Sequence, residues 1–187
     1  MPLQTVRRVL PHEYSKYRTH LKALDSDSRT LRFANPVSDF IIDQFCDGVE
    51  AEPSRHILFA VEDSELNFIA VGHIARFEPM ELAFSVLKEY QGQGLGNRLM
   101  ERCIQWCRVH DILEGTMICL THNSAIRHLC RKHGIAVTTE AGEALADIRL
   151  PPADMTTFIS ETVDNNVSTL DWFAKRVARL APRLTTQ

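Results

Sequence analysis

The segment over residues 86–99 most constrains the fold of this chain, because glycine occupies three alternate positions within it. Gly92, Gly94 and Gly96 stand between a strand-like run and a periodic apolar stretch that predicts a helix over 94–110. Glycine lets the backbone come close to a ligand and leaves several N–H groups available. At a helix start, where the helix dipole also favours an anion, such groups predict a diphosphate cradle.

The spacing of these glycines disfavours two common nucleotide-binding loops. A P-loop ends in Gly-Lys-Ser/Thr, whereas Gly96 is followed by Asn97 and Arg98. A dinucleotide fingerprint needs its third glycine where this chain has Asn97, and the acidic residue expected after a following parallel strand is missing. Two interpretations therefore remain, a cradle for another phosphate ligand and a glycine-rich turn that binds nothing.

The rest of the chain predicts an α/β (α+β) fold. Strands are expected at 3–9, 56–63, 67–76, 80–87, 116–120, 135–139 and 143–150, and helices at 11–24, 38–47, 94–110, 124–133 and 154–180, with a turn at 25–28 and another around Ala141 and Gly142. The short connection between the second and third strands predicts a hairpin and then an antiparallel meander. The run 116–120 lacks polar alternation, so we expect it to be buried on both faces.

The glycine segment closely resembles the acyl-CoA signature of the GNAT superfamily, Val-x-x-x-x-Gln/Arg-x-x-Gly-x-Gly/Ala. Val86, Gln91, Gly94 and Gly96 occupy each defined position. The resemblance implies a GNAT fold over about residues 3–150, with a mixed, mostly antiparallel sheet splayed at its centre and flanked by helices. A C-terminal amphipathic helix is added to it. We expect a domain over 1–152 and a helical extension over 153–187.

A second motif extends the resemblance, because many GNAT proteins have an Asn, a short helix and Lys-x-Gly-Phe after the fifth strand. Asn123, Leu129, Lys132 and Gly134 fit this pattern, and Ile135 replaces the aromatic residue. By resemblance Asn123 contacts the CoA arm where the fourth and fifth strands diverge. The same residue also fits an ordinary helix N-cap, and both roles are compatible.

The resemblance implies acetyl-CoA as acyl donor and assigns residues to it. The pyrophosphate would rest on the loop Gln91, Gly92, Gln93, Gly94, Leu95, Gly96 and Asn97, and the pantetheine arm would pair with Phe84, Ser85 and Val86. The reaction implied is direct transfer of an acetyl group to a primary amine. A binding sensor with little catalysis is the alternative.

Two residues are candidates for proton transfer. Amine attack on a thioester needs a group that accepts a proton. Glu81 shares a strand face with the small residues Ala83 and Ser85, and bacterial protein-lysine acetyltransferases of the superfamily use a Glu at this place as base. A solvated glutamate at a strand end is the alternative. Cys130 stands where many relatives have an acid tyrosine, although a cysteine in such a helix also suits core packing.

The acceptor is constrained only by charge. Residues 25–52 contain the carboxylates Asp25, Asp27, Asp39, Asp43, Asp47, Glu50 and Glu52, against Arg29 and Arg32. An acidic wall of this kind would attract a cationic acceptor, such as a protein lysine, a polyamine or another small amine. A solvated helix face is the alternative explanation of the same run.

Composition excludes several other classes. A net charge of −3 and a pI near 6.2 argue against a nucleic-acid binder. No stretch approaches the ~18 apolar residues of a membrane span, and the N-terminus lacks a signal-peptide core, so we expect a cytoplasmic protein. The five cysteines and eight histidines form no metal-binding spacing, so no metal is expected.

The C-terminal segment has an apolar stripe at helical spacing. Its members are Phe158, Val163, Val167, Leu170, Ala174, Val177 and Leu180. Such a stripe predicts an amphipathic helix that packs on its own domain, or one that forms a contact with a partner, including a homodimer.

Overall fold

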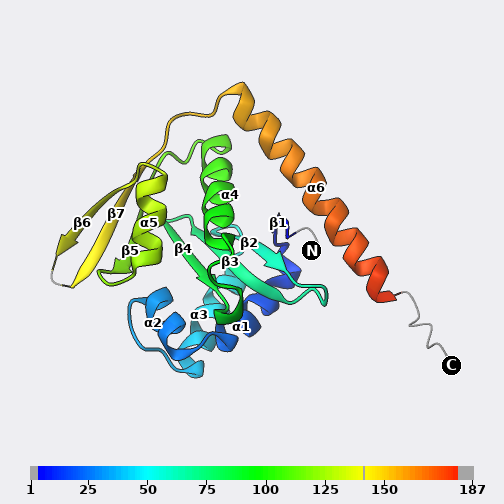
Figure 1. Ribbon diagram of the computed structural model, residues 1–187, viewed down its shortest axis with the longest axis horizontal. Helices are drawn as coiled ribbons and strands as arrows, with labels where there is room; N and C mark the ends of the chain where they lie inside the picture. Colours follow the sequence, from blue (N-terminus) through cyan, green and yellow to red (C-terminus); the bar gives the residue numbers. More distant parts are fainter. Residues whose placement is uncertain (1–3, 141, 181–187) are drawn as a thin grey trace.

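The computed structural model describes residues 4–140 and 142–180, so Leu3 and Ala141 lie outside the described residues. The strands are β1 (Val6–Arg8), β2 (His56–Glu62), β3 (Phe68–Ala75), β4 (Met80–Val86), β5 (Glu114–Leu120), β6 (Ala136–Glu140) and β7 (Glu143–Arg149). The helices are α1 (Tyr14–Ala23), α2 (Ser26–Phe33), α3 (Asp39–Ala51), α4 (Leu95–Val109), α5 (Ser124–Lys132) and α6 (Met155–Leu180). Single 3₁₀ turns at Pro11–Glu13 and Lys88–Tyr90 precede α1 and the glycine loop (Figure 1).

All strands join one sheet in the order β1-β2-β3-β4-β5-β7-β6. Every neighbouring pair is antiparallel except β4 and β5, which run parallel. These two strands pair only at Met80–Gly115 and Glu81–Thr116 and then separate. The expected mixed, mostly antiparallel sheet splayed at its centre is thereby confirmed.

Gly115 permits the close approach of β4 and β5 at the point where they still pair. A Cβ atom at this position would lie 2.5 Å from Cε and 2.7 Å from the carbonyl oxygen of Met80. Real Cβ atoms do not approach other atoms so closely, so any larger residue would push the two strands apart. Gly115 therefore lies where the two halves of the sheet, β1–β4 and β5–β7, begin to diverge.

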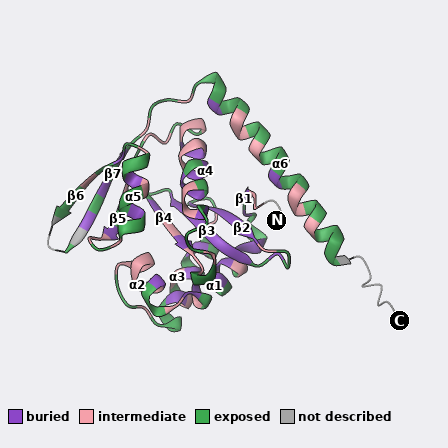
Figure 2. Cartoon of the chain, viewed as in Figure 1, coloured by how far each residue is buried: buried purple, intermediate pink, exposed green. Residues whose placement is uncertain are grey.

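Two apolar cores lie on opposite faces of the sheet (Figure 2). Helix α4 buries Leu95, Leu99, Met100, Cys103, Trp106 and Cys107 against one face. Helices α1 and α3 cover the other face through Tyr17, Leu21, Ile42, Cys46 and Val49. Because both faces of β2 and β3 are covered, every residue of these two strands is buried.

Residues 26–33 form helix α2, so the turn expected at 25–28 is wrong. The Asp25 carboxylate caps this helix by accepting a hydrogen bond of 2.8 Å from the Ser28 N–H. An Asp N-cap satisfies one of the N–H groups that a helix start leaves unpaired. The segment Asp25-Ser26-Asp27-Ser28 is thus a helix start whose polar residues resemble those of a turn.

Strand β5 is not buried on both faces, contrary to the sequence expectation. Gly115, Met117 and Cys119 are buried, whereas Ile118 is 53% exposed. Helix α5 packs on the face of β5 that carries Met117 and Cys119, and Ile118 lies on the opposite, open face (Figure 2). Apolar composition alone did not reveal this, because Ile118 is an apolar residue on the open face.

Helix α6 lies beside α4 and β1 (Figure 1). Polar side chains of α6 contact the domain. Arg102 of α4 contacts Glu161 and donates to Asn165 Oδ1 over 2.9 Å, and Thr5 donates to Asp171 Oδ2 over 2.6 Å. The apolar stripe expected from the sequence, from Phe158 to Val177, faces outward instead. The side chain of its last member, Leu180, lies outside the described residues. No described helix combines the length and apolarity that crossing a bilayer requires.

Candidate functional site

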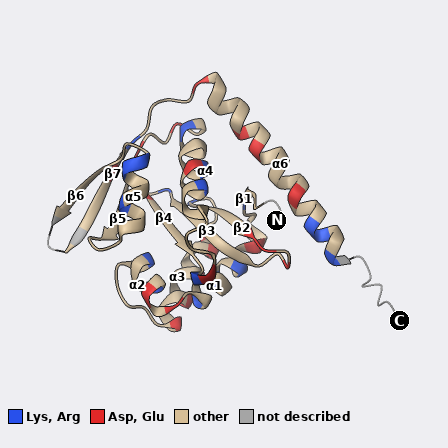
Figure 3. Ribbon diagram, in the orientation of Figure 1, with Lys and Arg blue, Asp and Glu red and all other residues tan. Residues whose placement is uncertain are grey.

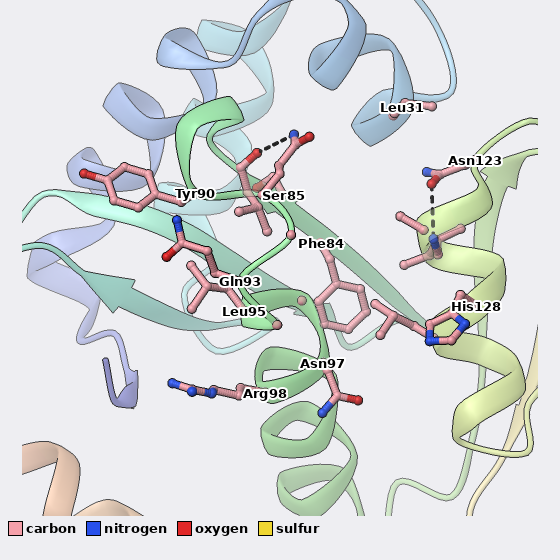
Figure 4. Close-up of a pocket in the computed structure, with 18 of the residues that line it drawn as sticks. Leu31, Phe84, Ser85, Tyr90, Gln93, Leu95, Asn97, Arg98, Asn123 and His128 are labelled. Carbon is pink, nitrogen blue, oxygen red and sulfur yellow. Dashed lines mark hydrogen bonds between the residues drawn. The ribbon is translucent and has the colours of Figure 1, made fainter. Parts of the chain in front are cut away.

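A cavity of about 720 Å³ lies between β4 and α5, where the two strands β4 and β5 have separated (Figure 4). Its lining includes every residue that the sequence assigned to a cofactor, namely Phe84, Ser85, Val86, Gln91, Gly92, Gln93, Gly94, Leu95, Gly96, Asn97 and Asn123. The structure therefore brings the strand, the glycine loop and the start of α5 to one place. Ser28, Leu31 and Arg32 of α2 complete the opposite wall.

The glycine loop has a backbone that only glycine adopts easily. Gly92 and Gly94 have φ values of +76° and +80°. Gly94 is also the N-cap of α4, and because glycine has no side chain, no side-chain oxygen of this residue caps the helix. The first-turn N–H groups of α4 lack helical acceptors and lie at the cavity, where they can bind an anion.

The Gln91 side chain holds the loop in position. Its Nε2 donates to the Val86 carbonyl oxygen and to Ser28 Oγ, each over 3.1 Å. One amide therefore links the end of β4 with α2. Sequence reasoning missed the second contact because it placed no helix at residues 26–33.

The cavity wall is positively charged. Arg32, Arg98 and Lys132 line it, and none of the described residues in its lining is Asp or Glu. The Arg98 guanidinium also donates to the Gln4 carbonyl oxygen over 3.0 Å, which fixes the side chain beside the loop. Charge and backbone N–H groups together favour a polyanionic ligand.

Helices α4 and α5 approach each other closely behind the loop. A Cβ at Gly96 would lie 3.3 Å from Cδ1 of Leu129, so a glycine suits this contact. Asn123 caps α5 by accepting a hydrogen bond of 3.2 Å from the Ile126 N–H. The capping interpretation of Asn123 is thus correct, and the same residue also reaches the cavity.

Ser85 is buried and bonded to a histidine that the sequence did not single out. His20 Nδ1 lies 2.8 Å from the Phe68 carbonyl oxygen, and His20 Nε2 lies 2.8 Å from Ser85 Oγ. Burial lowers the pKa of His20 to about 4, so the ring is neutral at pH 7. Because Nδ1 donates to a carbonyl, Nε2 accepts a hydrogen bond from the Ser85 hydroxyl.

A second polar network lies on the same face of the sheet. Arg32 Nη2 donates to Tyr17 Oη over 2.9 Å and lies 3.3 Å from His73 Nδ1. His73 Nε2 in turn lies 2.9 Å from His56 Nδ1. Burial and the Arg32 charge hold the pKa of His73 well below its usual value. The network fixes Arg32 at the cavity wall and joins α1, α2, β2 and β3.

The structure places neither proton-transfer candidate in the cavity lining. Glu81 is exposed and belongs to the last residue pair between β4 and β5, on the strand face of Ala83 and Ser85. It therefore stands at the point where the splay begins. Cys130 is 0% exposed within the core on the α4 side, and burial raises the pKa of its thiol to about 11.

The acidic run over 25–52 does not form a wall of the cavity. Figure 3 shows both acidic and basic positions on the helices α1, α2 and α3. Arg18 contacts Asp43 and Asp47 over 3.1 and 2.7 Å, and Arg29 contacts Asp39 over 2.7 Å. The sequence count overlooked Arg18 because α1 precedes the run in the chain. These three carboxylates therefore pair with arginines of α1 and α2 outside the cavity lining, which favours the solvated-face interpretation.

Sequence reasoning did not assign ten of the lining residues to the cofactor: Ser28, Leu31, Arg32, Tyr90, Arg98, Ala125, Ile126, His128, Leu129 and Lys132. The cap signal at Asp25 and Ser28 could have located α2 and hence the first three. Helical spacing from Asn123 places His128 and Lys132 on α5, but the facing direction of that helix depends on tertiary packing. Across the described part of the chain, no group of His, Cys, Asp and Glu is arranged to hold a metal ion.

Comparison with known proteins finds that this chain is similar to acetyltransferases. The model of the acetyltransferase (GNAT) family matches residues 20–135. A curated relative, acetyltransferase Pat of Mycolicibacterium smegmatis, is 29% identical over 102 residues, which cover 54% of this chain and 30% of that protein. The chain thus matches less than a third of the length of that relative.

Solved structures share the fold. The GNAT domain of PAT from S. lividans has a TM-score of 0.63 at 20% identity, over 78% of this chain and 89% of that one. Spermidine N-acetyltransferase from Vibrio cholerae, solved with CoA and spermine, has a TM-score of 0.59 at 14% identity, over 77% and 92% of the two chains.

Proposed function

Because this chain belongs to the GNAT acetyltransferase family, whose members transfer an acetyl group from acetyl-CoA to an amine, we propose that it catalyses this transfer in the cavity beside β4. The observation that carries the proposal is the coincidence of a glycine-built anion cradle with an open strand edge in a carboxylate-free cavity. Acetyl-CoA offers a polyanion at one end and an amide-bearing arm at the other. The cavity provides a complement to each part.

The pyrophosphate would bind at the start of α4. There the N–H groups of the loop Gln91–Asn97 and the helix dipole favour negative charge. Arg98 and Lys132 also line the cavity and would add ionic contacts to the phosphates. The cations would raise the rate of association as well as the affinity.

The pantetheine arm would pair with the open edge of β4. The Leu87 N–H donates to the Ile69 carbonyl oxygen over 2.9 Å, toward β3. Since N–H groups alternate in direction along a strand, those of Phe84 and Val86 point toward the gap between β4 and β5. No β5 residue pairs with β4 beyond Glu81, so these N–H groups are available for the amides of the arm.

The chemical step would be direct attack of a neutral amine on the thioester carbonyl. A C–N bond forms, the C–S bond breaks, and the CoA thiolate leaves and takes a proton from water. Glu81 would accept the amine proton directly or through a water molecule. A backbone N–H of β4 near Val86 would stabilise the tetrahedral oxyanion. Cys130 has no part in this mechanism because its thiol is buried away from the cavity.

The acceptor would be a primary amine approaching from the side of Glu81 and α2. A lysine side chain, a polyamine and another small amine all fit this chemistry. The paired carboxylates of α3 do not favour one of them. The cytoplasmic location expected from the sequence belongs to the same proposal.

An acetylation assay tests the proposal. The protein is incubated with acetyl-CoA and a panel of lysine peptides, polyamines and small amines, and released CoA and acetylated product are both quantified. We expect that one class of amine is acetylated and that the amount of CoA released equals the amount of this product. We also expect no acetyl adduct on the protein when the amine is omitted. Tight acetyl-CoA binding without turnover on any amine would instead support a binding sensor and overturn the enzymatic proposal.

A further inference from the structure

Helix α6 is amphipathic, but its apolar face points away from the domain. The outward side chains include Ile159, Val163, Leu170, Phe173 and Val177, which are 51–70% exposed. The face toward the domain is polar, with Thr157 and Ser168 5% and 3% exposed. An amphipathic helix that packs on its own domain normally buries its apolar stripe, so the observed arrangement leaves that stripe without a partner in the described structure.

Ionic and polar contacts fix this orientation of α6. Lys175 contacts Asp171 over 2.8 Å and donates to the Glu62 carbonyl oxygen over 3.1 Å. At the other end Arg102 contacts Glu161 and Asn165. The side chains of Arg102 and Glu161 are only 6% and 12% exposed, so their pairing is shielded from solvent. Rotation of α6 to bury the stripe would break these contacts and leave the buried Arg102 charge without its carboxylate partner, with only the neutral Gln105 side chain still accepting a hydrogen bond from it.

The exposed stripe has the spacing of a coiled coil. Ile159, Val163, Asn166, Leu170, Phe173 and Val177 follow one another at alternating steps of four and three residues. This is the a/d pattern of a heptad repeat, whose side chains interlock with those of an identical helix. The stripe runs for about 27 Å at the helical rise of 1.5 Å per residue.

We propose that α6 is a homodimerisation helix, which forms a parallel two-stranded coiled coil with α6 of a second copy of this chain. Asn166 supports both the partner and the direction. It is the one polar member of the stripe, and in a parallel pair it lies opposite its own counterpart, so the two amides bond to each other. An antiparallel pair in this register would place it opposite Leu170.

The residues flanking the stripe agree with an identical partner. Ser160, Thr162, Val167, Thr169 and Ala174 are uncharged, so two copies can approach without like charges facing each other. The exception is Arg176, whose guanidinium lies 5.1 Å from the Trp172 ring centre. A helix that lies on an anionic lipid surface carries an excess of Lys and Arg along its length, whereas the three basic residues of α6 are confined to its last turns and are balanced by three carboxylates, Glu161, Asp164 and Asp171. Because the domain already holds α6 in helical form, dimerisation does not have to order it.

The test is the molar mass of the full chain in solution, by light scattering or sedimentation equilibrium. We expect twice the chain mass of 21.3 kDa for the wild type and a monomer for Leu170→Lys. Phe40→Lys is the matched control, because Phe40 is also highly exposed, at 67%, but lies on α3. It should remain a dimer. A monomeric wild type, or a dimer that Leu170→Lys does not change, would overturn the proposal.

Cysteine crosslinking tests the direction of the pair. The five native cysteines are buried, so mild oxidation should act on an introduced surface cysteine. Asn166→Cys should form a covalent dimer, because d positions face each other in a parallel coiled coil. Thr162→Cys, one turn earlier on the flank, should not. Crosslinking of both or neither variant would contradict the parallel register. Binding of the monomer to anionic vesicles, lost in Leu170→Lys, would assign the stripe to a lipid surface instead.

Discussion

The two sides of the cavity are built in different ways. The proposed donor side rests mainly on one continuous segment, the loop Gln91–Asn97 followed by α4, and backbone conformation defines it through positive φ at Gly92 and Gly94. The acceptor side consists of side chains from α1, α2, β3 and β4 that meet only in the folded protein, such as His20 with Ser85. Side-chain changes on the acceptor side should therefore alter catalysis or stability more strongly than they alter acetyl-CoA binding.

The largest expected effect is on catalysis, from Glu81→Gln. General base catalysis contributes about 10²–10⁴-fold, so kcat should fall by that factor while the Kd of acetyl-CoA stays unchanged. The pH dependence of kcat assigned to the base should also disappear. Glu89→Gln is the matched control, since Glu89 is exposed like Glu81 but lies beside the glycine loop rather than at the start of the splay, and it should behave as wild type. An unchanged pH-rate profile in Glu81→Gln would show that another group is the base.

The next effect concerns stability at acidic pH. Burial lowers the pKa of His20 from 6.5 to about 4, so the unfolded chain binds a proton before the folded chain does. The stability from the neutral ring is fully present above pH 6.5 and is lost as the pH falls toward 4, by up to about 3 kcal/mol.

Urea denaturation at several pH values would measure this loss. His20→Asn should reduce the slope of unfolding free energy against pH over this window. His122→Asn, which changes an exposed histidine after β5, should leave the slope as it is. Equal slopes for the wild type and His20→Asn would show that His20 is not held neutral by burial.

Gly115→Val tests the place where the two halves of the sheet begin to diverge. The added side chain would overlap Met80, and overpacking of this kind costs about 1–3 kcal/mol. Chemical denaturation should show that loss, with weaker acetyl-CoA binding because the gap between β4 and β5 changes. Gly48→Ala is the control, since a Cβ on that helical glycine meets nothing within 4 Å. If Gly115→Val were as stable as wild type, close strand approach would not depend on this glycine.

The smallest effect expected is that of Ser28→Ala. It removes one of two acceptors of the Gln91 amide, and a hydrogen bond contributes about 0.5–1.5 kcal/mol. The Kd of acetyl-CoA should therefore rise about two- to tenfold. Thr30→Ala, on the exposed side of the same helix, should leave the Kd unchanged. A Kd unaffected by Ser28→Ala would show that the donor loop holds its shape without α2.

The sequence predicted the donor side well because its determinants are local. Glycine spacing, a following amphipathic helix and an Asn cap can all be read within a few residues, and every predicted donor residue lines the cavity. The acceptor side was less accessible. Ser85 was recognised on its strand, but its partner His20 lies 65 residues earlier in the chain. Only the packing of α1 on β3 and β4 brings the two side chains together.

The same limit explains the errors in the helices. Residues 25–28 have a composition shared by turns and helix caps, and the helix that follows them decides between the two. For α6 the pattern predicted an amphipathic helix correctly, but it could not show which face contacts the domain. That choice depends on Arg102 and Glu62, which belong to α4 and β2.

The most direct test of the proposed donor site is calorimetric titration of acetyl-CoA into the wild type and two glycine variants. Gly94 and Gly134 both have positive φ, +80° and +67°, and a Cβ at either meets nothing within 4 Å. Valine should strain both backbones alike, but only Gly94 lies in the cavity lining. We predict micromolar binding by the wild type and Gly134→Val, and none by Gly94→Val. A folded wild type that does not bind, or a Gly94→Val variant that binds equally well, would contradict the assignment.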